Sequence, residues 1–341
     1  MRITNRMMTT QYTRSLNELS VELNRLNTQV ASGRKFAKSS ENTSAAIKAF
    51  QIRKDMLKTE GYQANVAHAK ASLTDAEAAL SHIEELMRTA SERILFALNG
   101  TQSGEERKVV TTELRNIRDQ LFQTLNSSTS GSYHFGGTNT TTRPFEIVGG
   151  KLQYNGFSLD LPLPADTPAA NEALFADLEK DSMILDIGLN TKFDSVTGKV
   201  DESTVFGYSI AGINIVGRGT VTIGGEEFSN NLYDLLGALA SELESGSYSY
   251  DKADALFGHF KTATGSIGKS ITVIGAKTSY LEFMAERMAD RVFNMQERQV
   301  SVEGIDPAAA IIQFESQKFA YTAALQMGSK IIQPSIFDFM S

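Results

Sequence analysis

Apolar residues recur at alternating steps of three and four along several stretches of this chain. Close to its start, the stretch LNELSVELNRLNTQVASG (residues 16 to 33) has this pattern. Its apolar positions are Leu16, Leu19, Leu23, Leu26 and Val30. A heptad pattern buries its side chains only when a second helix lies alongside. The pattern therefore predicts a helix that needs a partner.

Longer patterns of the same kind follow in both halves of the chain. One reads Val66, Ala69, Leu73, Ala76, Leu80, Ile83, Met87, Ala90, Ile94 and Ala97. After NGTQSG (99 to 104), a shorter helix is predicted from Val110, Leu114, Ile117 and Leu121. The second half gives Ile267, Ile271, Ile274, Thr278, Leu281, Ala285, Met288, Val292 and Met295. Several such stripes favour a long bundle or coiled coil over one helix on a globular core.

The last stretch of the chain offers a partner for the first. Asp306 is a good N-cap and Pro307 suits the first helical position, while Pro334 ends the pattern. The predicted helix has about 27 residues and is roughly 40 Å long. Its seam is Ile311, Phe314, Lys318, Tyr321, Leu325, Gly328 and Ile332. Two seams of similar length at opposite chain ends would bury each other, and the inner helices would pair in the same way.

The middle of the chain is rich in turns. Residues 144 to 230 contain four of the six prolines and 11 of the 26 glycines. Apolar residues alternate around Asn155-Gly156, which is typical of a hairpin with a type I′ turn. The stretch TVFGYSIAGINIVGRGTVTIGGEEF continues with β-branched residues and Gly224-Gly225. A small antiparallel β domain between two helical arms is predicted.

The expected fold class is mainly α with a β insert. The N- and C-terminal arms form a long antiparallel helical hairpin or coiled-coil bundle, with the β domain at its tip. The predicted division is a terminal coiled-coil domain (1–40 with 305–341), a helical bundle domain (41–143 with 228–304) and a β-rich outer domain (144–227).

Composition narrows the possible functions. The formal net charge of −7 gives no general attraction to a polyanion, so we expect no nucleic-acid binding. The absence of Cys excludes disulfides, thiol catalysis and cysteine-bound metals. No apolar run reaches 18 residues, so we expect no membrane span. The N-terminus lacks an apolar signal region and has no acidic residue before Glu18. An ordinary polar end, a transit-like segment and an uncleaved export signal all fit it.

Catalytic and ligand-binding motifs are weak. ATGSIGKS (263 to 270) resembles a phosphate-binding loop, but Ala263 replaces its first glycine and a helix, not a strand, precedes it. His68, His82, His134 and His259 have no metal-ligand spacing and are expected to be solvated. Glu84-Glu85 and Glu105-Glu106 are adjacent pairs that face different sides of a helix. We therefore expect no enzyme, no cofactor and no metal.

Several segments, in their order along the chain, resemble one family. They are MRIT at the start, YHFGGTNTTTRPF (133 to 145), GINIVG (212 to 217), IGAKTSYLE (274 to 282) and PSIFDFM (334 to 340). Together with the Leu16-to-Gly33 stretch and the C-terminal helix, they are similar to the flagellin-like proteins of the bacterial flagellum. Within that family, the junction proteins between hook and filament resemble this chain more than flagellin does.

This resemblance implies a secreted structural protein without a cleaved signal, exported unfolded by the flagellar type III pathway. It implies a ring of copies that joins the first hook-associated protein (hook-associated protein 1) to flagellin, with the terminal helices lining the inner tube. It also implies an export chaperone before secretion. Flagellin itself, the filament subunit, is the alternative, and the start and end of the chain argue against it. The residues expected to form the assembly seam are Leu16, Leu19, Leu23, Leu26, Val30, Ile311, Phe314, Tyr321, Leu325 and Ile332.

Overall fold

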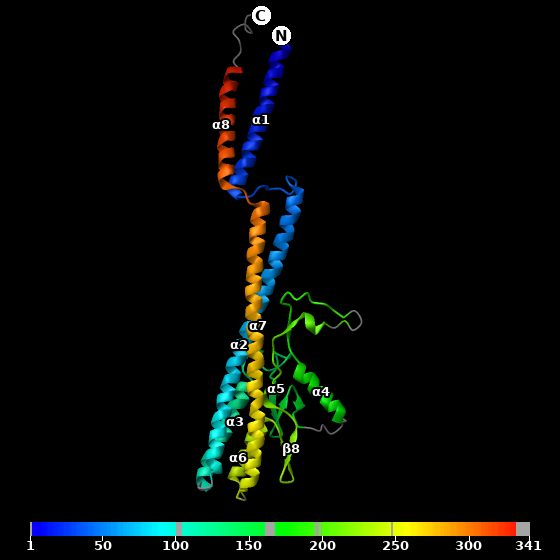
Figure 1. Cartoon of the computed structure of the whole chain (residues 1–341), viewed down its shortest axis with the longest axis vertical. Coiled ribbons are helices and arrows are strands. Elements are labelled where there is room, and N and C mark those ends of the chain that lie inside the picture. Colours follow the sequence, from blue (N-terminus) through cyan, green and yellow to red (C-terminus); the bar gives the residue numbers. More distant parts are fainter. Residues whose placement is uncertain are drawn as a thin grey trace. The chain divides into compact units, whose positions relative to one another are not determined.

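The computed structural model describes residues 2–99, 104–160, 168–194, 198, 200–246 and 248–331. The chain divides into two compact units, Met1–Glu60 with Ala289–Ser341 and Gly61–Met288. Helices make up most of both units (Figure 1). The long helices α2 (Thr43–Leu98) and α7 (Tyr250–Glu303) each supply residues to both units.

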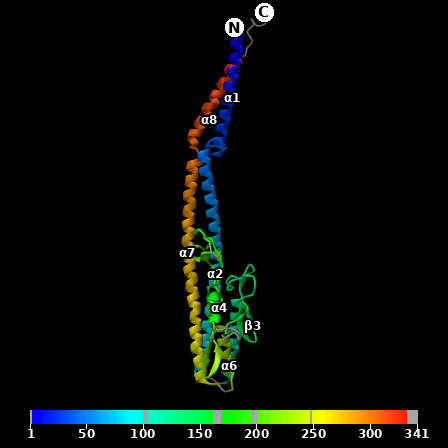
Figure 2. The same cartoon turned by 90° about the vertical axis from the view of Figure 1, so that its right-hand side faces the viewer.

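In the first unit, helix α1 (Arg2–Ser32) lies beside α8 (Pro307–Ile331), as Figures 1 and 2 show from two sides. Leu26 of α1 is buried, and so are Ala310 and Gly328 of α8. The other predicted seam residues of α1, namely Leu16, Leu19, Leu23 and Val30, are half-buried. The pairing of the two chain ends is therefore confirmed.

Small residues of α8 set the closeness of this pair. The Tyr12 hydroxyl donates a hydrogen bond to the Ala324 carbonyl at 2.8 Å. A Cβ atom placed on Gly328 would lie only 2.0 Å from the Tyr12 oxygen, so no larger residue fits there without a shift. Farther from the chain ends, the Gln317 side-chain amide donates to the Leu19 carbonyl at 3.5 Å. Glycine and alanine thus let the tyrosine ring lie against the α8 backbone.

The predicted seam of α8 lies toward α1 only in part. Gly328 of this seam is buried against Tyr12, and Phe314 and Tyr321 are half-buried. Ile311 and Leu325 are 49% and 45% exposed, and Lys318 is exposed too, while Ile332 lies outside the described residues. Gln317 and Ala324, beside the predicted positions, also contact α1. The closest contact is therefore made by small residues and not by the large apolar side chains.

The segment that follows α1 is hydrogen-bonded to the segment between α7 and α8. Gly33 adopts a φ of 67°, and its carbonyl accepts a hydrogen bond from the Ile305 amide at 3.1 Å. The Lys35 amide donates to the Glu303 carbonyl at 2.6 Å. Asp306 then caps α8 as expected, since its carboxylate accepts from the Ala308 amide at 2.9 Å.

The second unit has a core shared by α2, α3 (Gly104–Leu125), α6 (Leu232–Glu244) and α7. The ten residues of the predicted α2 seam, from Val66 to Ala97, are all buried. In the parts of α3 and α7 that belong to this unit, the buried predicted residues are Val110, Leu114, Ile117, Leu121, Ile267, Ile274, Leu281 and Met288, and the half-buried ones are Ile271, Thr278 and Ala285. The heptad interpretation of the inner helices is confirmed, because each seam faces neighbouring helices of this unit.

Short antiparallel strands follow α3. They are β1 (Ser128–Thr129), β2 (Ser132–Tyr133), β3 (Phe145–Val148), β4 (Lys151–Tyr154), β5 (Phe157–Ser158), β6 (Ile184–Leu185), β7 (Phe206–Gly207), β8 (Thr220–Ile223) and β9 (Glu226–Ser229). They form the sheets β1-β2, β3-β4-β5, β6-β7 and β8-β9. Asn155 and Gly156 have φ angles of 47° and 81°, as the predicted type I′ turn requires. Gly224-Gly225 joins β8 to β9 in the same way, with φ angles of 62° and 87°.

Helical pieces in this middle region were not predicted. They are α4 (Pro168–Lys180), the 3₁₀ turn η1 (Glu202–Thr204) and α5 (Ile213–Val216). Pro168 was taken as a turn signal, yet it opens α4, where a proline costs no hydrogen bond. A short β-branched run such as α5 fits either a strand or a helical turn, so its pattern alone could not decide.

The β-rich segment packs against the long helices of its unit. The Asn65 amide donates to the Asp186 carbonyl at 2.8 Å, and the Ser266 hydroxyl donates to the Ile215 carbonyl at 2.7 Å. The rings of His68 and Tyr208 meet edge to face at 5.8 Å. We expected this segment at the tip of the hairpin, and within this unit it also packs along the sides of α2 and α7.

Removing a core side chain of α2 should destabilise the second unit. Leu80 is fully buried, so Leu80→Ala should lower the free energy of unfolding by about 2–5 kcal/mol. Glu84→Ala, four residues along the same helix and exposed, is the control and should change it little. Thermal unfolding followed by circular dichroism checks this, and equal shifts would contradict the heptad frame.

A methyl group at Gly328 should separate α8 from α1. Gly328→Ala should destabilise the first unit by about 1–3 kcal/mol, because the methyl group overlaps the Tyr12 ring. Gly268→Ala in α7 is the matched control, since a Cβ there meets nothing within 4 Å. The control should be neutral or stabilising by up to about 1 kcal/mol through helix propensity. Hydrogen exchange of the α8 amides is the measurement, and unchanged protection in Gly328→Ala would refute the close approach.

Candidate assembly surface

The motif that resembles a phosphate loop forms no such loop. Residues 263–270 lie inside the continuous helix α7, so their amides are used in helical hydrogen bonds. A phosphate-binding loop presents free backbone amides to the phosphates. This segment therefore does not form the nucleotide site that the motif describes.

Two of the four histidines are less exposed than expected. His68 and His82 are exposed, whereas His134 and His259 are half-buried. His68 and His134 line one cavity of the second unit, and the Nε2 atom of His134 lies 3.1 Å from the Thr129 hydroxyl. Burial lowers the pKa of His134, since the charged ring loses water. Within the described ranges, no group of three or more His, Cys, Asp or Glu residues could hold a metal ion. None of the described helices combines the length and apolar character needed to cross a lipid bilayer.

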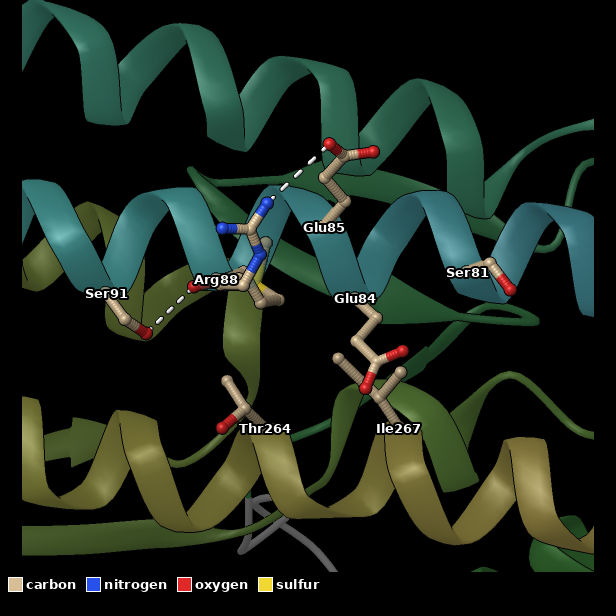
Figure 3. Close-up of a pocket in the computed structure, with 8 residues that line it drawn as sticks. Ser81, Glu84, Glu85, Arg88, Ser91, Thr264 and Ile267 are labelled. Atoms are coloured by element: carbon tan, nitrogen blue, oxygen red, sulfur yellow. Dashed lines mark hydrogen bonds and ion pairs between the residues drawn. The ribbon is translucent and has the colours of Figure 1, made fainter.

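An open groove of about 490 Å³ lies between α2 and α7 (Figure 3). Figure 3 shows Glu84 directed toward Ile267, whereas Glu85 is directed away from α7. Arg88 is paired with Glu85 at 3.8 Å and with Glu92 at 3.0 Å. The adjacent carboxylates diverge as expected, so they cannot act together on one substrate as an acid and a base.

Helix α8 carries apolar side chains outside its contact with α1. We call this set the outer α8 face; it consists of Ile311, Ile312, Phe319, Leu325 and Met327. Phe319 is 75% exposed and Ile312 is 70% exposed. The buried positions Ala310 and Gly328 belong to the α1 side, so apolar residues surround the helix. A helix that is apolar all round is normally buried among several neighbours.

Other helices of the first unit carry exposed apolar pairs at heptad spacing. Phe50 and Leu57 of α2 are seven residues apart, and Phe293 and Val300 of α7 have the same spacing. In α8 the pair is Ile312 and Phe319. Side chains seven residues apart lie on one face of a helix, as in a surface that packs on another helix. The heptad spacing of these exposed pairs is present in the sequence, but it was not recognised because each pair lies beside a longer apolar seam.

The predicted assembly residues fall into two groups. In α1, Leu26 is buried and the other four are half-buried against α8. In α8, Phe314 and Tyr321 are half-buried, while Ile311 and Leu325 lie on the outer α8 face. The buried and half-buried residues belong to the contact between α1 and α8. The exposed residues Ile311 and Leu325 are available to another molecule.

An ion pair between the partly exposed Arg53 and the buried Glu303 joins α2 to α7 in the first unit. The Glu303 side chain is only 6% exposed and binds Arg53 at 2.9 Å. It also accepts a hydrogen bond from the Gln299 amide at 3.3 Å. Removal of one partner would leave a buried charge uncompensated, which is costly. The start of α2 and the end of α7 are thereby held together inside the first unit.

Comparison with known proteins agrees with this architecture. Residues 3–140 match the family model of the bacterial flagellin N-terminal helical region. The chain is 23% identical to flagellar hook-associated protein 3 of Escherichia coli (strain K12) over 347 aligned positions, which cover 99% of both chains. It is 30% identical to flagellar hook-associated protein 3 of Salmonella typhimurium over 151 residues. That match covers 44% of this chain and about half (48%) of the Salmonella protein.

A solved structure shows the same fold. The flagellar junction protein of Legionella pneumophila superposes with a TM-score of 0.52 at 14% identity, covering 76% of this chain and all of that protein. Both the long helices and the small antiparallel sheets belong to this flagellin-like fold. The chain resembles flagellar hook-associated protein 3 along nearly its whole length, and its residues 3–140 resemble the flagellin N-terminal helical region.

Proposed function

We propose that this chain is a structural subunit of the bacterial flagellum at the junction between hook and filament. The observation that carries the proposal is the nearly full-length similarity to flagellar hook-associated protein 3. The outer α8 face supports it, because a junction subunit must present apolar surface to neighbouring subunits.

Assembly would supply the apolar contacts that one subunit lacks. Each square ångström of apolar surface removed from water contributes about 25 cal/mol. The side chains of Ile312, Phe319 and Met327 gain little of this in a single chain. A tubular assembly uses different faces of each subunit for its neighbours, so the outer α8 face and the exposed pairs of α2 and α7 serve different contacts.

The proposed partners are the first hook-associated protein, flagellin and further copies of this chain in a ring. In this arrangement the terminal coiled coil (1–40 with 305–341) lines the inner tube, the helical bundle forms the middle shell, and the β-rich domain (144–227) faces outward. The three-part division remains part of the proposal.

Before assembly, the subunit would be secreted by the flagellar type III apparatus and bound by an export chaperone. Ile311 and Leu325 are exposed in the folded chain and suit such binding. Phe314 and Tyr321 are half-covered by α1, so a chaperone that uses all four would separate α8 from α1. This would keep the terminal helices unpaired until export.

An enzymatic role is not part of the proposal. The relatives named above are flagellar proteins, and the α2–α7 groove has diverging, exposed or paired charges. We likewise infer no cofactor, nucleic-acid or membrane partner.

Flagellin is the less supported alternative, because the matched proteins are hook-associated. Electron microscopy of cells that lack this protein separates the two functions. A junction subunit leaves bare hooks and monomeric flagellin in the medium. If the purified protein instead grows long filaments from seeds, it is the filament subunit.

The terminal pair should be the first part of the monomer to be digested. Among residues 7–32 of α1 and 307–328 of α8, whose side chains the structure describes, only Leu26, Ala310 and Gly328 are buried, so little apolar surface offsets the cost of ordering the helices. Limited trypsin digestion should cut at Arg14, Arg25 and Lys318 before it cuts the second unit. Mass spectrometry identifies the fragments, and resistance of these sites in the monomer would oppose coupled folding and assembly.

A charge on the outer α8 face should block assembly without unfolding the subunit. Phe319→Asp should change monomer stability by less than about 0.5 kcal/mol, because Phe319 is exposed, yet abolish motility. Gln313→Asp adds the same charge to an exposed polar position of α8 and is the control. Leu23→Asp, in the α1 seam, should also abolish motility. Swimming assays and thermal unfolding test this; a motile Phe319→Asp strain would remove the outer α8 face from the assembly surface.

A further inference from the structure

A second cavity lies in the Gly61–Met288 unit, between α7 and the segment that surrounds α4 and α5. Its volume is about 370 Å³. One wall is a single face of α7, with Ser266, Lys269, Ser270 and Lys277 at helical spacing. Lys269 and Ser270 are the last two residues of the motif that resembles a phosphate-binding loop. The fold thus brings that motif to a polar cavity through its side chains, although it forms no loop.

The opposite wall adds polar groups. It contains the end of α4 with Lys180, the following residues Asp181 and Ser182, then Ser209, and Asn214 of α5. The Ser182 hydroxyl donates to the Ser209 carbonyl at 3.0 Å. Lysine and serine side chains from two separated parts of the chain therefore surround one space.

The lysines of this cavity are not neutralised by its acids. Glu179 is paired with Arg218 at 2.7 Å. Asp181 accepts hydrogen bonds from the amide and the hydroxyl of Thr138, both at 3.0 Å. Neither Lys180 nor Lys269 forms an ion pair with any residue that the structure describes. Three lysines therefore line the space, and Asp181, which stays charged when Thr138 donates to it, is the one lining carboxylate without an ion pair among the described residues.

Lys277 is the least satisfied of the three. Its ammonium reaches only the Ser209 carbonyl, at 3.5 Å, which is long for a hydrogen bond. It is half-buried, and burial lowers its pKa because the charged form loses water. Lys70, by comparison, is paired with Glu282 of α7 at 2.7 Å. A cation that loses water is stable when an opposite charge accompanies it, and no residue in the described part of the chain forms an ion pair with Lys277.

We propose that this cavity binds a small phosphate-bearing anion, either inorganic phosphate or a phosphate monoester. Lysine ammonium groups with neighbouring hydroxyls suit phosphate oxygens, since each oxygen accepts charge-assisted hydrogen bonds. The anion lies between Lys269 and Lys277 of α7 and Lys180 and Ser182 of the opposite wall. Binding ties α7 to the segment around α4 and α5. This inference does not depend on the junction function.

Thermal unfolding of the full-length protein in added sodium phosphate tests the site. Sodium chloride at equal ionic strength is the salt control, acetate tests for general anion binding, and glycerol phosphate tests the monoester. Phosphate should raise the melting temperature well above chloride, because a ligand that binds only the folded state stabilises it. A larger shift with glycerol phosphate identifies a monoester as the ligand, and an equal shift identifies the phosphate group alone. Equal shifts with chloride or acetate would overturn the proposal.

Three variants localise the effect. Lys269→Gln should weaken phosphate binding about tenfold, since it removes one charge-assisted hydrogen bond. Lys277→Met should abolish the phosphate response yet keep or raise the melting temperature without phosphate, because it removes a poorly compensated charge. Lys54→Gln, an exposed lysine of the other unit, is the matched control and should respond like the wild type. A full response in Lys269→Gln would refute the site, and this variant decides the matter if Lys277→Met does not fold.

Discussion

The apolar surface of α8 is the constraint on which the rest of this protein depends. One side of the helix, with Ala310, Ala324 and Gly328, is small enough for α1 to lie close. The remaining sides carry Ile312, Phe319 and Met327, which α1 cannot cover. A single helix covers one stripe of its neighbour, so an all-round apolar helix needs further partners. A single chain thus leaves much of the apolar surface of α8 uncovered.

The second unit covers the apolar faces of its helices within one chain. Leu80, Ile83 and Leu114 are fully buried, and α3 and α6 cover what the α2–α7 pair leaves open. The β-rich segment adds Phe135, Phe145 and Tyr154 to the same core. Burial of the Tyr154 ring raises the pKa of its hydroxyl, since the phenolate would lose water there. The second unit therefore covers its apolar seams by itself, whereas the first unit leaves large apolar side chains of α8 exposed.

The predictions that the sequence made well concern periodicity and local turn chemistry. Seam residues such as Leu73, Leu80 and Ile274 are buried because a heptad pattern specifies which face of a helix is apolar, whatever helix covers it. Asn155-Gly156 forms the expected turn because these two residues accept positive φ angles. The pairing of the chain ends and the resemblance to flagellin-like proteins also followed from sequence.

Other features were decided only by tertiary structure. The α8 pattern was ambiguous, since large apolar residues lie all round the helix and only the approach of Tyr12 to Gly328 selects the small-residue face. From sequence, Pro168 could end a turn or begin a helix. In the structure it begins α4, and this helix places Phe175 in the core. The lysine cavity joins Lys180 to Lys277, which no local pattern relates. Periodicity determines what a segment can bury, whereas the choice among neighbours depends on contacts between residues far apart in the chain.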